Sequence, residues 1–287
     1  MYKRQGEERT YYDDFYEHAP VRGAPGALAA LARTWTEPTA PWEMQRVWNR
    51  LGDLRNQTVL LLGNGESHNE LYLLTQKPQA LIYSDLSPVG LRVLRRHVDA
   101  AGHGNLLFAA IDAMDLPLRD GSVDVVYGFA FAHHLPDVER FLGEVARVLR
   151  PGGRCVLMDN AYSPAWQHIK LVWLRPLMRL SHRREPRSPE DVRETMAGGF
   201  REERLAEIIR GVGGIPWFER VALLYYVWHR ASVALFPEAA RLVPRHDLIS
   251  AACIRADGFL SRFAFMRRNM IRLIWGFDKP RHGGASP

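Results

Sequence analysis

Cysteine is scarce in this sequence. Only Cys155 and Cys253 occur among 287 residues, with no Cys-x-x-Cys pair and no cluster of cysteine with histidine. Two isolated thiols cannot build a disulfide framework or a four-ligand zinc site, so small disulfide-rich folds and zinc fingers are excluded. We therefore expect a cytoplasmic protein without a bound metal.

Long apolar runs are missing as well. No stretch reaches the roughly 18 consecutive apolar residues of a transmembrane helix, and the first residues lack the apolar core of a signal peptide. The opening MYKRQ resembles vector-derived sequence, so we leave it out of the fold prediction. Hydrophobic residues still form 47% of the chain, which suffices for a sizeable globular core.

Positive charge is concentrated in one half of the chain. Residues 151–287 hold 22 Lys and Arg against 13 Asp and Glu, a net charge of +9, whereas residues 1–150 sum to −3. A basic half can attract an anionic substrate, a membrane surface or nucleic acid, or it can be an ordinary solvated face.

Five short apolar runs predict β-strands. Their near-continuous apolar character is typical of strands that are buried on both faces. Amphipathic stretches at 68–76, 88–101 and 136–149 separate them and predict helices. The runs are 59–63, 80–85, 105–112, 123–129 and 154–160. This alternation predicts an α/β fold, a Rossmann-like and mostly parallel sheet with helices on both faces.

We expect three regions along the chain. Residues 1–55 predict an N-terminal helical segment, with helices near 24–33 and 41–54. Residues 56–160 form the Rossmann-like core, with the ligand at the carboxyl ends of its strands. Residues 161–287 predict a C-terminal helical cap that completes the sheet and binds the acceptor. Within it we expect a helix at 188–200 and a late strand near 218–227, while 261–279 fits helix or strand.

The sharpest motif is a glycine turn after the first predicted strand. The sequence VLLLGNGES runs from Val59 to Ser67 and leads into a predicted helix. Gly63 and Gly65 allow backbone angles and a close ligand approach that a Cβ would prevent. Such a turn can also be a plain connection, so it indicates a nucleotide site only together with other residues.

Two acids support a nucleotide site. Asp85 ends the second strand 20 residues after Gly65, the spacing at which nucleotide-binding units place the acid that binds ribose hydroxyls. Asp112 ends the third strand, where its carboxylate can accept from an adenine amino group while Ala113 or Met114 covers the ring. Each acid can instead be a turn-forming residue.

Other features narrow the nucleotide. His68 stands where a dinucleotide fingerprint needs a small residue, which argues against NAD and FAD, and no Gly-Lys-Ser/Thr follows the turn, so a P-loop is absent. A nucleoside with an amino-acid tail and no phosphate fits the remaining pattern. S-adenosylmethionine is such a molecule.

Residues 59–160 resemble the class I S-adenosylmethionine-dependent methyltransferases, in particular the methyltransferase type 11 group. Four segments carry the resemblance in order, namely LLGNGES, IYSDLSPVGL, DAMDLPLRDGSVDVV and AHHLPDVERFLGEVARVLRPGGR. The sequence departs from the family pattern at Leu61, where an acid is frequent, and at Ser67, where glycine is frequent. We expect Glu66 to compensate by receiving the ammonium group of the cofactor.

The resemblance implies a cofactor site for S-adenosylmethionine. It places the methionine part near the glycine turn, the ribose on an acid, the adenine between the third strand and its loop, and the end of the fourth strand under the cofactor. In chain order the implied residues are Gly63, Asn64, Gly65, Glu66, Asp85, Leu86, Asp112, Ala113, Met114, Gly128 and Phe129.

Two histidines are the candidate catalytic residues. His133 and His134 follow the fourth strand at its carboxyl end, near the expected methyl group, and histidine titrates near neutral pH. Either one can be the general base that removes a hydroxyl proton, or it can simply orient the loop.

We expect an enzyme that methylates a small molecule, on oxygen rather than on nitrogen or carbon. The acceptor classes are a sugar, a polyketide-like, a lipid or a quinone-type compound. The aromatic segments 168–180 and 215–228 can pack in the core, line an acceptor pocket or contact a membrane peripherally. The alternatives are methylation of RNA or another macromolecule, although no nucleic-acid-binding module is recognisable, and a non-catalytic nucleoside-binding relative. The sequence does not reveal the oligomeric state.

Overall fold

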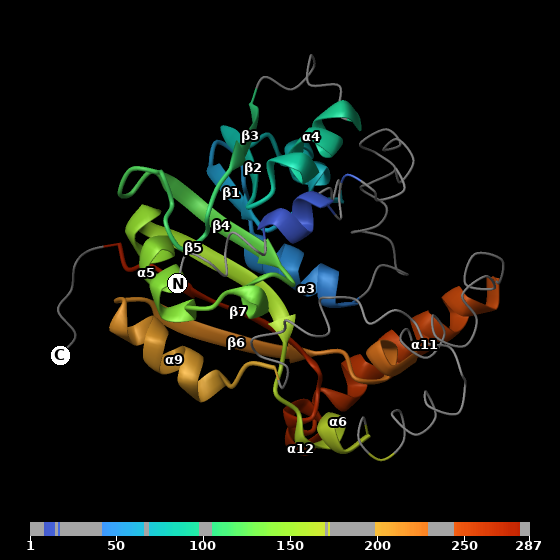
Figure 1. Cartoon of the computed structure of the whole chain (residues 1–287). Helices are drawn as coiled ribbons and strands as arrows, with labels where there is room; N and C mark the ends of the chain where they lie inside the picture. The colour runs from blue at the N-terminus through green and yellow to red at the C-terminus, as the bar shows by residue number, and fades with distance from the viewer. Residues whose placement is uncertain are drawn as a thin grey trace.

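Figure 1 shows the computed structural model of the chain, which describes residues 9–14, 17, 42–65, 69–97, 105–169, 172, 199–228 and 244–281. Seven strands of this described part form one sheet in the order β3-β2-β1-β4-β5-β7-β6. Strand β7 runs antiparallel to its neighbours β5 and β6, and the other neighbouring pairs are parallel. The strands are β1 (Thr58–Leu62), β2 (Ala80–Asp85), β3 (Leu106–Ala110), β4 (Val123–Phe129), β5 (Leu149–Asn160), β6 (Ile215–Val221) and β7 (Arg272–Asp278). The predicted Rossmann-like sheet is confirmed.

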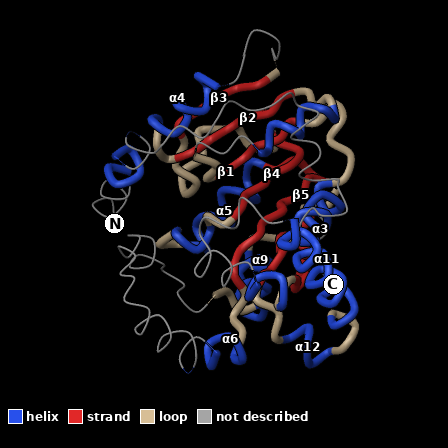
Figure 2. Tube along the Cα trace, turned by 90° about the vertical axis from the view of Figure 1, so that its right-hand side faces the viewer, coloured by secondary structure: helices blue, strands red, loops and turns tan. Residues whose placement is uncertain are grey.

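Helices cover both faces of the sheet. One face packs against α3 (Trp42–Leu51), the 3-10 helix η1 (Asn69–Gln76) and α4 (Pro88–His97), and the other packs against α5 (Val138–Val148) and α9 (Glu202–Gly211). Figure 2, turned by 90°, shows the strands running through the middle of the molecule, with α5 on one side of β4 and β5 and α3 on the other. The other described helices are η3 (Ala132–His134), α6 (Pro164–Ile169), α11 (Pro244–Leu260) and α12 (Ala264–Arg268).

Strand β1 shows why the sequence runs are almost purely apolar. Leu60 and Leu62 belong to the core on the α5 side, whereas Val59 and Leu61 belong to the core on the α3 side. Because successive side chains of a strand point to opposite faces, a strand covered on both faces needs apolar residues at every position.

The strand order fixes where a ligand can bind. From β1 the chain proceeds outward to β2 and β3, and it then returns to the other side of β1 to form β4 and β5. The connections that follow β1 and β4 therefore diverge to opposite faces and leave a crevice at the carboxyl ends of these strands. The glycine turn lies at this point.

Several predicted element boundaries differ from the structure. Strand β5 begins at Leu149, directly after α5, and a shift in its pairing with β4 accommodates Pro151, Gly152 and Gly153. The predicted helix at 68–76 is the 3-10 helix η1, and the ambiguous stretch at 261–279 contains α12 and β7. The helix predicted at 41–54 is α3, and those near 24–33 and 188–200 lie outside or almost wholly outside the described residues.

The predicted strand near 218–227 is wrong beyond Val221. Strand β6 covers Ile215–Val221, and residues 224–228 are helical. The carboxylate of Asp257 accepts the backbone N–H groups of Leu223, Leu224 and Tyr225 at 3.1, 2.8 and 3.0 Å. A carboxylate that accepts these free N–H groups stabilises the start of a helix. Among the described helices, none is both long and apolar enough to span a membrane.

Candidate active site

A cavity of about 190 Å³ lies at the carboxyl ends of β1, β2, β3 and β4. It is lined by Tyr12, Leu62, Gly63, Asp85, Leu86, Ile111, Asp112, Ala113, Met114, Ala130, Phe131, His134, Leu135 and Pro136. Among the described residues, the lining contains two carboxylates and neither Lys nor Arg, so this part of the chain offers no fixed cation to bind a phosphate group. A larger open hollow of about 550 Å³ lies at the opposite, amino-terminal edge of the sheet, around Asp53 and Lys77.

The glycine turn is shaped by its contact with Phe131. Gly63 has φ +67°, and a Cβ built on it would lie 2.5 Å from both Cβ and Cγ of Phe131. A Cβ on Gly128 would lie 2.2 Å from Cε1 of the same ring. The ring therefore rests on two bare backbone positions, one from β4 and one from the turn after β1. Only glycine fits at either position without a shift.

Asp85 joins the glycine turn to the start of α4. Its Oδ2 accepts the N–H of Gly65 at 2.7 Å, and its Oδ1 accepts the N–H of Ser87 at 2.8 Å. The side chain is buried, and this burial raises the pKa of the carboxyl group. Each carboxylate oxygen has a second lone pair, so Asp85 can still accept hydrogen bonds from a ligand in the cavity.

An N-terminal segment covers part of this site. Residues 9–14 are helical, and Tyr12 lines the cavity with its ring edge-on to His134, 6.3 Å between centroids. Next to it, Asp13 accepts a hydrogen bond of 2.5 Å from the hydroxyl of Ser87. Tyr12 is not among the predicted site residues, because no periodicity in the sequence links this segment to the sheet.

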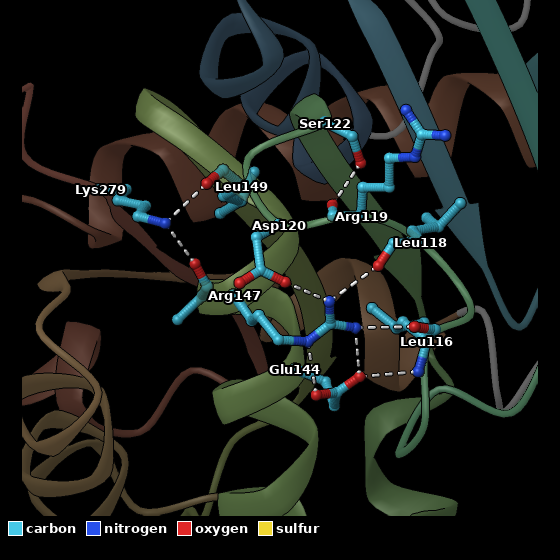
Figure 3. Close-up of polar contacts among 10 residues, drawn as sticks. Leu116, Leu118, Arg119, Asp120, Ser122, Glu144, Arg147, Leu149 and Lys279 are labelled. Carbon is cyan, nitrogen blue, oxygen red and sulfur yellow. Dashed lines mark hydrogen bonds and ion pairs between the residues drawn. The ribbon is translucent and has the colours of Figure 1, made fainter.

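The loop after β3 is held by α5. Asp112 Oδ1 accepts the N–H of Met114 at 2.9 Å, and the carbonyl of Met114 accepts from Arg140 Nε at 2.9 Å. Figure 3 shows Arg147 of α5 reaching the carbonyls of Leu116 and Leu118, both at 2.7 Å. These bonds fix the loop that carries Asp112, Ala113 and Met114 along the cavity.

The two candidate histidines have different surroundings. His133 is buried, and its Nδ1 lies 2.8 Å from Oδ1 of Asp159, whose other oxygen accepts from Trp275 Nε1 at 3.2 Å. Asp159 is fully buried. His134 lines the cavity, and its ring centroid is 4.0 Å from that of His133. Desolvation, followed by the charge of His133, lowers the pKa of His134 to about 4.

The cavity contains six of the predicted cofactor residues and one predicted histidine. These are Gly63, Asp85, Leu86, Asp112, Ala113, Met114 and His134. Asn64 is buried in the turn, and neither atom of its amide has a hydrogen-bond partner among the described residues. Gly65 contacts the site through Asp85, and Gly128 lies under Phe131.

Two other predicted residues that the structure describes do not line the cavity. Phe129 packs on the α3 side of the sheet, 5.4 Å from the guanidinium of Arg272, and His133 lies behind His134. Glu66 lies outside the described residues. Besides Tyr12, six lining residues were not predicted, namely Leu62, Ile111, Ala130, Phe131, Leu135 and Pro136. They stand in the sequence beside or close to predicted residues, and this proximity is the one feature that could have identified them.

Residues 60–157 match the model of a family described as "Methyltransferase domain". The chain is 36% identical over 135 residues to the fatty-acid O-methyltransferase of Mycolicibacterium smegmatis, across 46% of this chain and 47% of the relative. It is 35% identical over 135 residues to the phthiotriol/phenolphthiotriol dimycocerosates methyltransferase of Mycobacterium tuberculosis, across 46% of this chain and 48% of the relative. The matched part thus spans about half the length of these relatives.

A solved structure has a similar fold. The geranyl diphosphate C-methyltransferase of Streptomyces coelicolor superposes with a TM-score of 0.57 and 15% identity, across 96% of this chain and 98% of that one. That protein was crystallised with Mg²⁺, geranyl diphosphate and S-adenosyl-L-homocysteine.

Proposed function

We propose that the protein transfers a methyl group from S-adenosylmethionine to a small apolar acceptor. The starting point is that residues 60–157 of this chain match a methyltransferase domain. The observation that carries this proposal is the cavity at the carboxyl ends of β1 to β4. It brings together the glycine turn at Gly63 and the carboxylates of Asp85 and Asp112.

The residues of the cavity suit a nucleoside that carries positive charge and no phosphate. Asp85 would hold the ribose hydroxyls with the lone pairs that its two backbone hydrogen bonds leave open. Asp112 would accept from the adenine amino group, with Leu86, Ala113 and Met114 against the ring. When bound, S-adenosylmethionine supplies a methyl group on a positively charged sulfur, and the two carboxylates, which no Lys or Arg accompanies among the described lining residues, favour such a ligand.

The histidines suggest that the acceptor is a hydroxyl group. Asp159 orients His133 through Nδ1, which leaves Nε2 as the nitrogen that can take a proton. We propose that the acceptor hydroxyl reaches His133 beside the ring of His134, because 11% of the His133 side chain stays exposed there. His133 would accept the hydroxyl proton at Nε2, and Asp159 would act as its positioning residue. His134, neutral at pH 7, would form the wall of the cavity next to it.

The acceptor class that we favour is a lipid-like molecule. Two relatives are named for fatty acids and for phthiotriol dimycocerosates, and the cavity wall towards His134 consists of Phe131, Leu135 and Pro136. An apolar wall with few polar groups favours an apolar acceptor over a sugar.

Cofactor binding tests the first part of this proposal. Isothermal titration with S-adenosylmethionine should show binding, and Asp85→Ala should weaken it by about tenfold or more, because hydrogen bonds to a charged group are lost. Asp115→Ala is the matched control, since Asp115 is exposed and does not line the cavity. An absence of binding by the folded protein, or equal affinities of the two variants, contradicts the proposed site.

Two acceptors test the role of His133. With methyl-labelled cofactor, His133→Asn and Asp159→Asn should slow methylation of a long-chain alcohol by about 10²-fold or more. A long-chain fatty acid needs no base, because its carboxylate is already ionised at pH 7, so its methylation should be little affected. Equal losses on both acceptors, or a cofactor Kd that changes as much as kcat, would remove His133 from the proposed role.

A further inference from the structure

The end of α11 and the short helix α12 carry exposed aromatic and arginine side chains. Phe259, Phe263 and Phe265 are 56%, 51% and 76% exposed. The rings of Phe259 and Phe263 meet edge-on at 5.4 Å, and the guanidinium of Arg262 lies 5.9 Å from the Phe259 ring. We call these residues the aromatic–arginine surface, which comprises Phe259, Phe263, Phe265, Arg255, Arg262, Arg267 and Arg268.

An apolar stripe extends this surface along α11. Residues spaced by four, three and four positions share one face of a helix. In α11 every residue of one such series is exposed. Leu248, at its far end, is 72% exposed. The exposed series is Leu248, Ala252, Arg255 and Phe259, and the opposite, inward face carries the buried residues Ser250, Ile254 and Asp257. A helix that packs on one side normally presents polar residues on the other, so this face is unusual.

Within residues 248–268, no exposed acid accompanies the arginines. Between residues 248 and 268 the one acid is Asp257, which is 1% exposed and accepts three backbone N–H groups inside the protein. Arg255, Arg262, Arg267 and Arg268 are exposed, and none forms an ion pair with an acid in the described part of the chain. The surface therefore presents positive charge together with apolar rings.

The surface lies at the same edge of the sheet as the cavity. Strand β7 starts at Arg272, which pairs with Asn160 at the carboxyl end of β5. Helix α12 ends shortly before β7 begins, so it is placed beyond this carboxyl edge. Figure 1 shows α12 below the tip of β5 and α11 at the periphery of the molecule, away from the sheet.

We propose that the aromatic–arginine surface docks the protein on a bilayer that contains anionic phospholipids. Arginines are attracted by the negative headgroups, and phenyl and aliphatic side chains enter the boundary between headgroups and acyl chains. Nucleic acid would use the arginines and rings, but it gains nothing from the exposed aliphatic residues Leu248 and Ile249. A second copy would bring like charges together. The proposal does not rest on methyl transfer.

Co-sedimentation of the full chain with lipid vesicles tests the proposal. We expect binding to vesicles of phosphatidylcholine with about one third phosphatidylserine, and binding at least about tenfold weaker to phosphatidylcholine alone or at high salt. The double variant F263S/F265S and the triple variant R262Q/R267Q/R268Q should each weaken binding by about tenfold or more. Their side chains are exposed, so we expect both variants to fold.

Matched variants control for lost hydrophobicity and lost charge elsewhere. L107S/I215S removes two side chains that are 49% and 58% exposed at distant parts of the sheet, and R92Q/R95Q/R119Q removes three exposed arginines from the other half of the chain. Both should bind vesicles as the parent does. Titration of F263S/F265S with S-adenosylmethionine should give the parent affinity, which separates this test from that of the cofactor site.

Four results would overturn the proposal. The first is no binding of the protein to anionic vesicles, and the second is an equal loss of vesicle binding in the control variants. The third is a dimer in solution that F263S/F265S converts to a monomer. The fourth is an RNA oligonucleotide that displaces the vesicles and whose own binding needs the arginines but not the phenylalanines. The third result would assign the surface to a second copy of this chain, and the fourth would assign it to nucleic acid.

Discussion

Replacement of Gly63 by alanine probes the contact on which the glycine turn depends. The added Cβ would lie 2.5 Å from Phe131 Cβ, an atom fixed to the backbone, so no rotation of the Phe131 side chain removes that overlap. The φ angle of +67° is also unfavourable for alanine. Gly63→Ala therefore combines a backbone cost with a steric cost.

The two costs can be separated with a second glycine. A left-handed φ costs an L-residue about 1–2 kcal/mol, and overpacking a well-packed site adds about 1–3 kcal/mol. Gly121 has φ +59°, and a Cβ there meets nothing within 4 Å. Gly121→Ala thus carries the backbone cost alone. We expect a loss of about 2–5 kcal/mol for Gly63→Ala and about 1–2 kcal/mol for Gly121→Ala.

Urea unfolding of the parent and the two variants, without cofactor, measures these free energies. The m-values should agree among the three proteins, so that differences in midpoint report stability. If Gly63→Ala were no more destabilising than Gly121→Ala, the packing of Phe131 on the glycine turn would be refuted. The interpretation of Gly63 as a position that only glycine can fill would fall with it.

Other substitutions address the surroundings of the cavity. Gly128→Ala places a Cβ 2.2 Å from Phe131 Cε1, and the ring can avoid this overlap by turning into the cavity. We therefore expect calorimetry to show an affinity for S-adenosylmethionine lower by about tenfold or more, together with a modest loss of stability. Arg147→Gln removes the bonds to the loop after β3 and should cost about 2–4 kcal/mol in urea unfolding, whereas the exposed Arg119→Gln should change stability by less than about 0.5 kcal/mol. Burial lowers the pKa of His134 to about 4 in the folded protein. Between pH 6.5 and 4 the unfolded chain therefore binds the proton more readily than the folded protein does. The free energy of unfolding should consequently fall with acidification by up to about 1.4 kcal/mol per pH unit in this range. His134→Gln should flatten the Tm–pH curve in this range, and an unchanged slope would contradict the shift.

The sheet core was predictable from the sequence for a specific physical reason. Strands β1, β2 and β4 are covered on both faces, so their residues form nearly continuous apolar runs between turn residues, and the predicted ranges match closely. In a parallel sheet the functional residues follow the carboxyl ends of such strands. Gly63, Asp85 and Asp112 stand at these ends, and the cavity brings them together.

Contacts between segments that are distant in the sequence could not be predicted from the local apolar pattern. The end of β6 depends on Asp257, which lies 34 residues from Leu223, and the local apolar pattern of 218–227 gives no sign of it. Tyr12 reaches the cavity from a segment that has no periodic relation to the sheet. The exposed stripe of α11 was missed because apolar residues occur on both of its faces, so the sequence shows no amphipathic pattern.

The C-terminal region contributes to the surroundings of His133 through strand β7. Strand β7 pairs with β5 and β6, and its Trp275 donates to the same carboxylate that orients His133. Asp159 is fully buried, so each of its oxygens needs a partner, and the two partners come from segments far apart in the sequence, β7 and the segment after β4. The position of the histidine is therefore coupled to the pairing of the last strand. A protein that keeps β1 to β5 but loses β7 would leave Asp159 without its Trp275 partner and β6 without the strand it pairs with. The matched domain and the C-terminal region should therefore function as one unit.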